Sequence, residues 1–565
     1  MDYDIIANVY SALDNASGGL NKTTILGEFL EKIKGKYEYI YLLQGRIFAD
    51  YDPRELGMSA QLVIKAISKA SGFGEDRIME EFKRVGDLGE IAYDLVGKHK
   101  KQAALFVKKL TVEKVIGNFR KISELEGKGV VSTKIDLVVE LLLLASALEA
   151  KFLVRNVLGD LRIGVGVGIL RDSIVKCCFH PVDSEEKKNY GSEVQGAYDL
   201  ATDWAVVFEK SCSDKLSDIK LSPGRPVKVM LYPKVKSAEE ALRIVGSPAA
   251  FEYKCDGFRM MINKDDNGNV KLFTRRLEDV SLQFPEVVEF VKTHIDAKSF
   301  IIDSEAIGYD RKTKKYTDFQ AISQRIRRKY DIDKLVEKLP VELRVFDVIY
   351  LDGENLINKG YEERRGILVG LVKEEEFKVG LAKRIVTDNI DEANEYFAKA
   401  LSDNQEGLMV KGLDKKYKPG ARVGYGVKWK PVDSDFDLVI TGAEWGNGKR
   451  VGWLTSFDVA CRGYDGELLD IGKVGNGIKE LEQNVDSDDI SFESLTTILK
   501  ELVTSEDGKH VIVKPEVVVT VQFQNVQKSP TYSSGYALRF PRITRLRPDR
   551  SIENIVSVEE IKKEC

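Results

Sequence analysis

The sequence has no apolar segment long enough to cross a membrane. A transmembrane helix needs roughly 18 consecutive apolar residues, whereas the longest apolar run, residues 141–148, lies between Glu140 and Glu149 and is typical of a buried helix. Residues 1–4 (Met-Asp-Tyr-Asp) also lack the basic start and the apolar middle of a secretory signal. We therefore expect a cytoplasmic protein with no membrane partner.

Cysteine is scarce as well, and the chain has no excess of positive charge. The six cysteines are scattered without any C-x-x-C pair, which argues against a disulfide framework and against a structural zinc site. The net charge of -4 gives no general attraction to nucleic acid, so any such binding must use local basic surface. A hydrophobic content of 43% with 31% charged residues is typical of a globular protein.

The pattern of apolar residues changes twice along the 565 residues, a length that predicts about three to four domains. Up to residue 221 apolar residues recur at helical spacing, and no run has the period of a strand. After the break Ser-Pro-Gly-Arg-Pro at 222–226, alternating β-branched and aromatic runs are interrupted by helical segments. From residue 431 onward, short predicted strands are separated by glycine turns, a pattern that is typical of a small β-barrel. We predict a multidomain protein: an all-α domain over 1–221, an α+β domain built on antiparallel strands over 222–430, and an OB-fold β-barrel over 431–565.

One stretch of the middle domain, Glu-Tyr-Lys-Cys-Asp-Gly-Phe-Arg at 252–259, has the pattern of a strand that ends in a tight turn and starts again. A lysine at such a turn, partly desolvated and crowded by cations, can lose its proton and act as a nucleophile. Gly257 allows backbone to approach a ligand closely, and Arg259 offers donors suited to ribose or phosphate oxygens. The same letters fit a plain hairpin whose Lys254 and Asp256 face water, so the interpretation needs support from other segments.

Further charged residues of the middle domain stand on strands where a core strand would be apolar. Each carboxylate alone is more often a surface group, but two carboxylates and several cations occur together here. A nucleoside triphosphate and a divalent metal would neutralise such a set. We also expect the clustered cations to lower the pKa of Lys254. The set comprises Lys254, Arg259, Arg275, Glu305, Glu406, Lys428 and Lys430.

These residues belong to a series of motifs that follow one another along the chain. The motifs are E-Y-K-C-D-G-F-R (252–259), L-F-T-R-R (272–276), D-S-E-A (303–306), F-D-V-I-Y-L-D-G (346–353), E-G-L-M-V-K (406–411), V-K-W-K (427–430), K-S-P-T-Y-S-S-G-Y-A-L-R-F-P-R (528–542) and R-L-R-P-D-R (545–550). The ordered series, unlike any single motif, is specific. It resembles that of the ATP-dependent DNA ligases of the three-domain archaeal and eukaryotic type, and the resemblance covers nearly the whole chain.

The resemblance implies a reaction in three steps. Lys254 attacks the α-phosphate of ATP and releases pyrophosphate, the AMP passes to the 5′-phosphate at a nick in double-stranded DNA, and the 3′-hydroxyl then expels AMP and seals the strand. Such enzymes act in DNA replication, repair, recombination and cell division. The implied metal is Mg²⁺ or Mn²⁺, held by Glu305 and Glu406. The implied nucleotide-binding residues are Glu252, Arg259, Arg275, Glu305, Phe346, Arg422, Lys428, Lys430 and Arg545.

The resemblance extends to the helical domain, which is similar to the DNA-binding domain of these ligases. Arg155, Arg162 and Gly164 lie at glycine-rich turns and are the implied phosphate contacts. The glycines could instead serve close packing of helices. Ligases of this shape usually act as monomers, which we expect here.

A short segment at 102–106 resembles a sliding-clamp-binding peptide. Gln102, Leu105 and Phe106 would be its contacts with the clamp. The same side chains also fit an amphipathic turn that packs on its own domain, and both interpretations stay open.

Three positions depart from the usual motifs, namely Arg550 in place of lysine, Gly426 in place of an aromatic residue, and T-R-R at 274–276 in place of S-R-N. They leave the rate and the nucleotide preference open. RNA ligases and capping guanylyltransferases share the lysine motif but would not be expected to carry a helical domain of this size. A catalytically silent nick-binding scaffold is a further alternative, although it would not need the charged set around Lys254.

Overall fold

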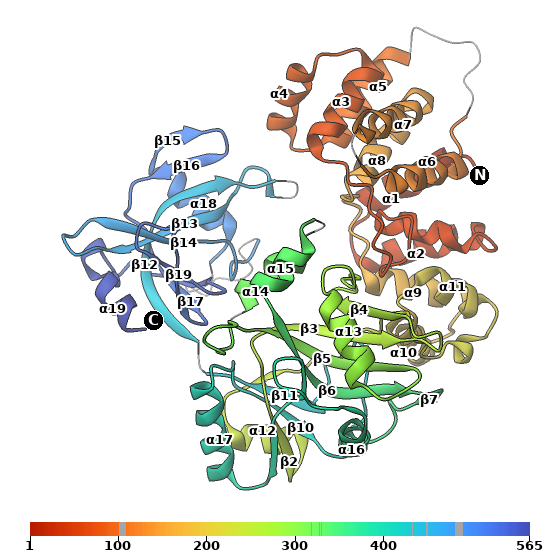
Figure 1. Ribbon diagram of the computed structural model, residues 1–565. Helices are drawn as coiled ribbons and strands as arrows, with labels where there is room; N and C mark the ends of the chain where they lie inside the picture. The colour runs from red at the N-terminus through yellow and green to blue at the C-terminus, as the bar shows by residue number, and fades with distance from the viewer. Residues whose placement is uncertain are drawn as a thin grey trace. The chain divides into compact units, whose positions relative to one another are not determined.

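The computed structural model describes all residues except 101–108, 128, 318, 327, 329, 432, 448–449, 481–489 and 565. The predicted clamp contacts Gln102, Leu105 and Phe106 therefore lie outside the described residues. The chain divides into two compact units, residues 1–430 and 431–565 (Figure 1). Each unit is described by itself, and the predicted boundary between residues 221 and 222 stays a prediction.

Residues 1–218 of the first unit are helical, as the apolar spacing predicts, and no strand occurs in their described part. Side chains cap many of these helices: Ser146 and Glu149 form a reciprocal capping box, and the Asp183 and Asp203 carboxylates accept backbone N–H groups. Their apolar faces share one core. The helices are α1 Tyr3–Asn15, α2 Gly19–Lys32, α3 Ala60–Ser71, α4 Glu75–Val85, α5 Leu88–Lys100, α6 Val112–Glu124, α7 Val130–Leu144, α8 Ala147–Val157, α9 Val167–Cys178, α10 Ser184–Ala201 and α11 Trp204–Cys212, with 3₁₀ turns at Tyr37–Gln44 and Leu216–Asp218.

Arg155 does not lie on the surface as the DNA-contact prediction requires. Its side chain is 6% exposed, and its Nη2 lies 2.8 Å from Asp87 Oδ2 and its Nη1 3.0 Å from Asp14 Oδ2. Glu90 is a third partner at 3.2 Å. A guanidinium held by three carboxylates in the helical core is not available to a phosphate, so we withdraw Arg155 from the predicted DNA contacts.

The other two predicted DNA contacts lie in the loop that follows α8. Arg162 is partly exposed, and its guanidinium contacts Asp160, Asp87 and the carbonyl oxygen of Gly86. Gly164 has a φ of +65°, a backbone conformation that favours glycine. Their contact with DNA stays a prediction.

Cys178 and Cys212 form a disulfide between α9 and α11. The cysteine spacing argued against a disulfide framework, and this single bond joins residues 34 positions apart in the sequence. No local motif marks such a pair, because the cysteines are brought together only by helix packing. Within the described residues, no helix is both long enough and apolar enough to span a bilayer.

Two sheets make up residues 234–429. One has five strands in the order β1-β11-β10-β2-β9, and the other has six, β4-β3-β5-β6-β7 with β8 beside β6. All neighbours are antiparallel except β1/β11 and β6/β8. The strands are β1 Lys234–Val235, β2 Ala249–Tyr253, β3 Phe258–Lys264, β4 Val270–Thr274, β5 Phe300–Gly308, β6 Val341–Leu351, β7 Glu354–Asn355, β8 Val379–Leu381, β9 Arg384–Thr387, β10 Leu408–Gly412 and β11 Gly426–Trp429; the helices are α12 Ala238–Val245, α13 Pro285–His294, α14 Phe319–Ile326, α15 Ile332–Lys338, α16 Tyr361–Leu371 and α17 Ile390–Ser402.

The chain passes from the five-stranded to the six-stranded sheet between β2 and β3, at residues 254–257. A Cβ on Gly257 would lie 2.3 Å from the carbonyl oxygen of Ala306 in β5, so only glycine fits this crossing. Lys254 is therefore placed at the junction of the two sheets.

The second unit is rich in strands. Seven strands form one sheet, β14-β13-β12-β16-β15 with β17 beside β12 and β20 beside β17, around an apolar core. Closure of this sheet into an OB-type barrel stays a prediction. The elements are β12 Ser434–Trp445, β13 Leu454–Arg462, β14 Leu468–Val474, α18 Phe492–Lys500, β15 Val503–Asp507, β16 His510–Val513, β17 Val518–Phe523, β18 Val526–Lys528, β19 Tyr536–Leu538, β20 Arg542–Leu546 and α19 Val558–Lys563.

The ion pairs of Arg155 predict how a substitution there acts. Arg155→Met leaves the buried Asp87 with a weakened partner set, so we expect the free energy of unfolding to fall by about 3 kcal/mol. Calorimetry of the thermal unfolding measures the loss. Arg84→Met is the matched control, because Arg84 forms only an exposed pair with Glu81 and should change little. A weaker affinity for DNA without any loss of stability would instead restore Arg155 as a DNA contact.

Candidate active site

A cavity of about 830 Å³ opens at the junction of the two sheets. Strands of both sheets line it: β2, β10 and β11 of the first, and β3 to β6 of the second. Its walls carry cations, carboxylates and an aromatic ring together. The predicted residues that line it are Glu252, Lys254, Arg259, Arg275, Glu305, Phe346, Arg422 and Lys428.

Lys254 is held from both its backbone and its side chain. Its N–H donates to the carbonyl oxygen of Gly407 at 2.9 Å, and its carbonyl oxygen accepts from the N–H of Glu406 at 2.8 Å. Its Nζ lies 2.5 Å from Glu406 Oε2, and Lys430 pairs with the same carboxylate. Glu406, the predicted metal ligand, thus lies beside Lys254. It also pairs with Lys430, the predicted phosphate contact.

The pKa of Lys254 is raised, and the expectation that neighbouring cations lower it is wrong for this state. Burial acts to lower the pKa, but the charges of Glu406 and then Glu305 outweigh burial and favour the ammonium. The prediction counted the lysines and arginines along the sequence and did not foresee that a carboxylate would lie within 3 Å of the ammonium. In this structure Lys254 is therefore an ammonium group paired with the Glu406 carboxylate.

Lys428 is the lysine whose pKa is lowered instead, to about 8. Burial is the main cause, and the positive charges of Lys254, Lys430, Arg275 and Arg422 add to it. An anion placed beside Lys428 would stabilise its ammonium form.

Glu305 faces Arg259 across the pair β3/β5. Burial raises the pKa of its carboxyl group to about 8, although the charges of Lys254 and Arg259 act to lower it. A buried carboxyl group with a raised pKa gains from a cation placed beside it. The carboxylate oxygens of Glu305 and of the nearby Glu406 suit a divalent metal. Such a metal binds one or two carboxylates and takes its other oxygen ligands from a phosphate.

The far end of the cavity combines an aromatic ring with a fixed carboxylate. Glu252 is 2% exposed, and its Oε1 and Oε2 accept from Lys411 Nζ at 2.6 Å and from the Tyr361 hydroxyl at 2.8 Å. Lys411 Nζ lies 4.8 Å from the centre of the Phe346 ring. A purine can stack on such a ring while its edge meets the polar groups.

Sequence reasoning missed Lys411 and Tyr361 as partners of Glu252. Lys411 is the last letter of the E-G-L-M-V-K motif and lies two residues beyond Met409, so strand alternation places both on one face. That signal was available in the sequence. Tyr361 begins α16, eight residues after the motif at 346–353, and none of the motifs includes it.

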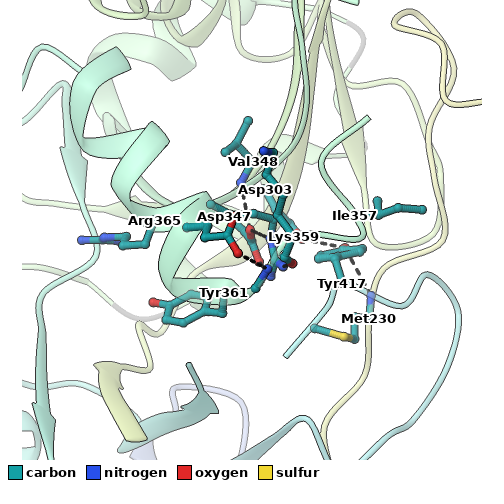
Figure 2. Close-up of polar contacts among 12 residues, drawn as sticks. Met230, Asp303, Asp347, Val348, Ile357, Lys359, Tyr361, Arg365 and Tyr417 are labelled. Atoms are coloured by element: carbon teal, nitrogen blue, oxygen red, sulfur yellow. Dashed lines mark hydrogen bonds and ion pairs between the residues drawn. The ribbon is translucent and has the colours of Figure 1, made fainter. Parts of the chain in front are cut away.

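Arg259 is fixed by a network of polar contacts with Asp303, Met230 and Tyr417, and these three partners are labelled in Figure 2. Its Nε donates to Asp303 Oδ1 at 2.8 Å, its Nη2 pairs with Oδ2, and its Nη1 donates to the carbonyl oxygen of Met230 at 2.9 Å. The Tyr417 hydroxyl donates to Asp303 at 2.9 Å. Asp303 is fully buried, so this network orients Arg259 from beneath the cavity.

The predicted residue Arg545 lies on β20 of the second unit, opposite Thr520. Its contact with the nucleotide stays a prediction. The predicted clamp contacts lie outside the described residues, as stated above.

A double-sheet fold with a lysine-centred cationic cavity defines the class of the protein as a nucleotidyltransferase. Three family patterns then match the chain: "DNA ligase N terminus" over residues 2–175, "ATP dependent DNA ligase domain" over 229–430 and "ATP dependent DNA ligase C terminal region" over 450–550. The chain belongs to the ATP-dependent DNA ligases. It is accordingly an enzyme that seals nicks in DNA with ATP.

Named relatives are similar over the full length. The chain is 43% identical to a DNA ligase of Nanoarchaeum equitans (strain Kin4-M), with 100% of this chain and 98% of that protein covered. It is 39% identical to a DNA ligase of Thermococcus fumicolans, again with 100% and 98% covered. A solved structure titled "Pmar-Lig_PreS3" has a TM-score of 0.55 at 16% identity, covering 96% of this chain and 99% of that one, which shows a shared fold.

The charges in the cavity predict the order in which its lysines titrate. Amine-reactive labelling at increasing pH, quantified by mass spectrometry, should give a midpoint near pH 8 for Lys428, whose pKa is about 8. Lys254 should react only at higher pH than an ordinary lysine, because its pKa is raised. Glu406→Gln removes the negative charge that favours the ammonium, so the midpoint of Lys254 should move to lower pH.

The exposed Glu289, which pairs with Lys292 on the surface of α13, provides the control. Glu289→Gln should leave both midpoints unchanged. An unchanged midpoint of Lys254 in Glu406→Gln would mean that Glu406 does not set its protonation.

Proposed function

We propose that Lys254 is the nucleophile that takes AMP from ATP. The single observation that supports this most directly is the position of its Nζ, at the junction of two sheets in a cavity that gathers eight of the predicted nucleotide and catalytic residues. The backbone bonds to Glu406 and Gly407 fix the approach of the side chain. A surface hairpin would not bury a lysine among these groups.

In the first step Lys254 loses a proton and its Nζ forms a bond to the α-phosphorus of ATP. The bond from that phosphorus to the bridging oxygen breaks, and pyrophosphate leaves with the electron pair. Glu406, at 2.5 Å from Nζ, is the nearest group that can receive the proton. Lys428 and Lys430 neutralise the charge that builds up on the α-phosphate.

The remaining cavity residues bind the rest of the nucleotide. Phe346 stacks on the adenine and Glu252 meets its polar edge, while Arg259, Arg275 and Arg422 contact ribose and phosphates. Arg545, from the C-terminal unit, contacts the phosphate tail during this step. These assignments rest on the resemblance, and the positions of the cavity-lining residues agree with them.

The site also suits a divalent metal, Mg²⁺ or Mn²⁺, with Glu305 and Glu406 as its carboxylates. The buried, largely neutral Glu305 supports this, because a cation would offset the cost of ionising it. Such an ion supplies charge neutralisation at the phosphates. The two carboxylates and the lysines of the chain orient the α-phosphate in line with Lys254.

In the second step AMP passes from Lys254 to the 5′-phosphate at a nick in double-stranded DNA. In the third step the 3′-hydroxyl attacks that phosphate and AMP leaves. Arg162 and Gly164 of the helical domain, residues 1–221, contribute DNA contacts. The adenylation domain comprises residues 222–430 and the C-terminal domain residues 431–565. We propose a cytoplasmic monomer that serves DNA replication, repair and recombination. Its segment at 102–106 binds a sliding clamp.

The nucleophile is tested with ATP labelled on the α-phosphate. The unaltered protein should take up acid-labile label and release it as AMP when nicked duplex DNA is added. Lys254→Ala should lose both the label and the sealing, because alanine lacks the amine that would take the AMP. Lys271→Ala, which changes an exposed lysine on β4, is the matched control and should keep them. A Lys254→Ala protein that still labels would refute the assignment, and release of label only to RNA ends would favour an RNA ligase.

The metal ligands are tested by binding of Mn²⁺, followed by electron paramagnetic resonance in the presence of a non-hydrolysable ATP analogue. Glu305→Gln removes one carboxylate oxygen ligand, so we expect weaker Mn²⁺ binding and a higher Mg²⁺ concentration for half-maximal self-adenylation. Asp310→Asn, in an exposed turn of the same domain, should change neither. Equal Mn²⁺ affinity in Glu305→Gln and the unaltered protein would exclude Glu305 from the metal site.

A further inference from the structure

The hydroxyl group of Tyr417 lies where three separate segments meet beneath the cavity. Tyr417 is 3% exposed and belongs to the loop between β10 and β11. Its hydroxyl donates to Asp303 Oδ2 at 2.9 Å and accepts from the N–H of Met230 at 3.3 Å and from Arg259 Nη2 at 3.3 Å. A hydroxyl has one donor and two acceptor lone pairs, so all three of its positions are used.

Arg259 depends on these contacts for its orientation. A guanidinium has five N–H donors; Asp303 takes two of them, and the Met230 carbonyl oxygen and the Tyr417 hydroxyl take one each. One N–H, on Nη1, is then left for a ligand in the cavity that Arg259 lines. The direction of this last donor is fixed by the other four.

The backbone around Tyr417 is fixed as well. Its N–H donates to the carbonyl oxygen of Ile357 at 2.9 Å, and the N–H of Leu231 donates to the carbonyl oxygen of Ala421 at 3.0 Å. Figure 2 shows Tyr417 between Met230 and Asp303. The neighbouring Arg422, which forms a bridge with Leu231, also lines the cavity. The same loop therefore carries the hydroxyl that holds Arg259 and the side chain of Arg422.

We infer that Tyr417 is a positioning residue for ATP binding: its hydroxyl, through Asp303 and by direct contact, aims Arg259 at the ribose and phosphates of the nucleotide. This rests on the proposed contact of Arg259 with ATP. Tyr417 itself does not touch the reacting atoms. None of the sequence motifs that point to the nucleotide includes it.

The conservative change Tyr417→Phe tests the inference, because it keeps the ring and its packing and removes only the hydroxyl. We expect the KM for ATP in self-adenylation to rise about fivefold while kcat changes less than twofold. Loss of a contact that binds substrate and transition state equally acts on KM, and a fivefold change matches the net contribution of one ordinary hydrogen bond.

Tyr10→Phe is the matched control. The Tyr10 hydroxyl is equally buried and donates to the carbonyl oxygen of Leu42 in the helical region, at 2.8 Å. Both variants should unfold at a somewhat lower temperature, and all assays run well below the lower of the two. Only Tyr417→Phe should raise KM, since a purely structural effect would appear in both.

A double-mutant cycle with Arg259→Lys decides whether the effect passes through Arg259. Lysine keeps the charge beside Asp303 but lacks the forked donors, so it should raise KM by itself. In this background Tyr417→Phe should add less than a twofold change. The same fivefold increase in both backgrounds, or no increase from Tyr417→Phe alone, would overturn the inference. If Arg259→Lys leaves KM unchanged, the proposed nucleotide contact of Arg259 fails instead.

Discussion

The geometry of the site depends on two backbone hydrogen bonds that join Lys254 to the segment 406–407. They connect the end of β2 with the start of β10. Glycine at 257 lets the first segment pass close to Ala306 in β5, and glycine at 407 lets the second pass close to Trp429 in β11. A Cβ at either position would lie 2.3 Å from a backbone oxygen. The nucleophile and the carboxylate beside it are thus placed by main-chain pairing, which is stiffer than any arrangement of long side chains could be.

Buried ion pairs beneath the cavity provide geometry more than stability. Arg364 and Asp347, at 2.7 Å, are both withdrawn from solvent, and Asp303 is fully buried beneath the partly exposed Arg259. Removing such charges from water costs about as much as their attraction returns. What they add is a fixed direction for each guanidinium, because a bidentate pair allows one planar arrangement. Four of the five N–H donors of Arg259 bind protein groups in this way. Its guanidinium is therefore already oriented before a ligand binds.

The sequence predicted which residues gather at the cavity better than it predicted their charge states. Strand alternation and motif order located Lys254, Glu305 and Lys428, because each lies on a strand or at its end and the period of two is local information. The ion pairs of Arg155 and the disulfide between Cys178 and Cys212 could not be predicted, since they join residues far apart in the chain. Tyr417 was not predicted for the same reason, because the partners of its hydroxyl lie more than 100 residues away in the sequence.

The raised pKa of Lys254 and the lowered pKa of Lys428 together suggest why the lysine is inert until a nucleotide arrives. Glu406 pairs with both Lys254 and Lys430, and its charge together with that of Glu305 favours the protonated form of Lys254. An α-phosphate would attract Lys428 and Lys430 and draw Lys430 away from Glu406. In the proposed first step Glu406 takes the proton of Lys254, and positive charge on the neighbouring lysines favours the neutral amine over the ammonium. The sequence-based expectation of a lowered pKa counted these cations and left out the two carboxylates, Glu406 and Glu305, that raise the pKa of Lys254 in the structure.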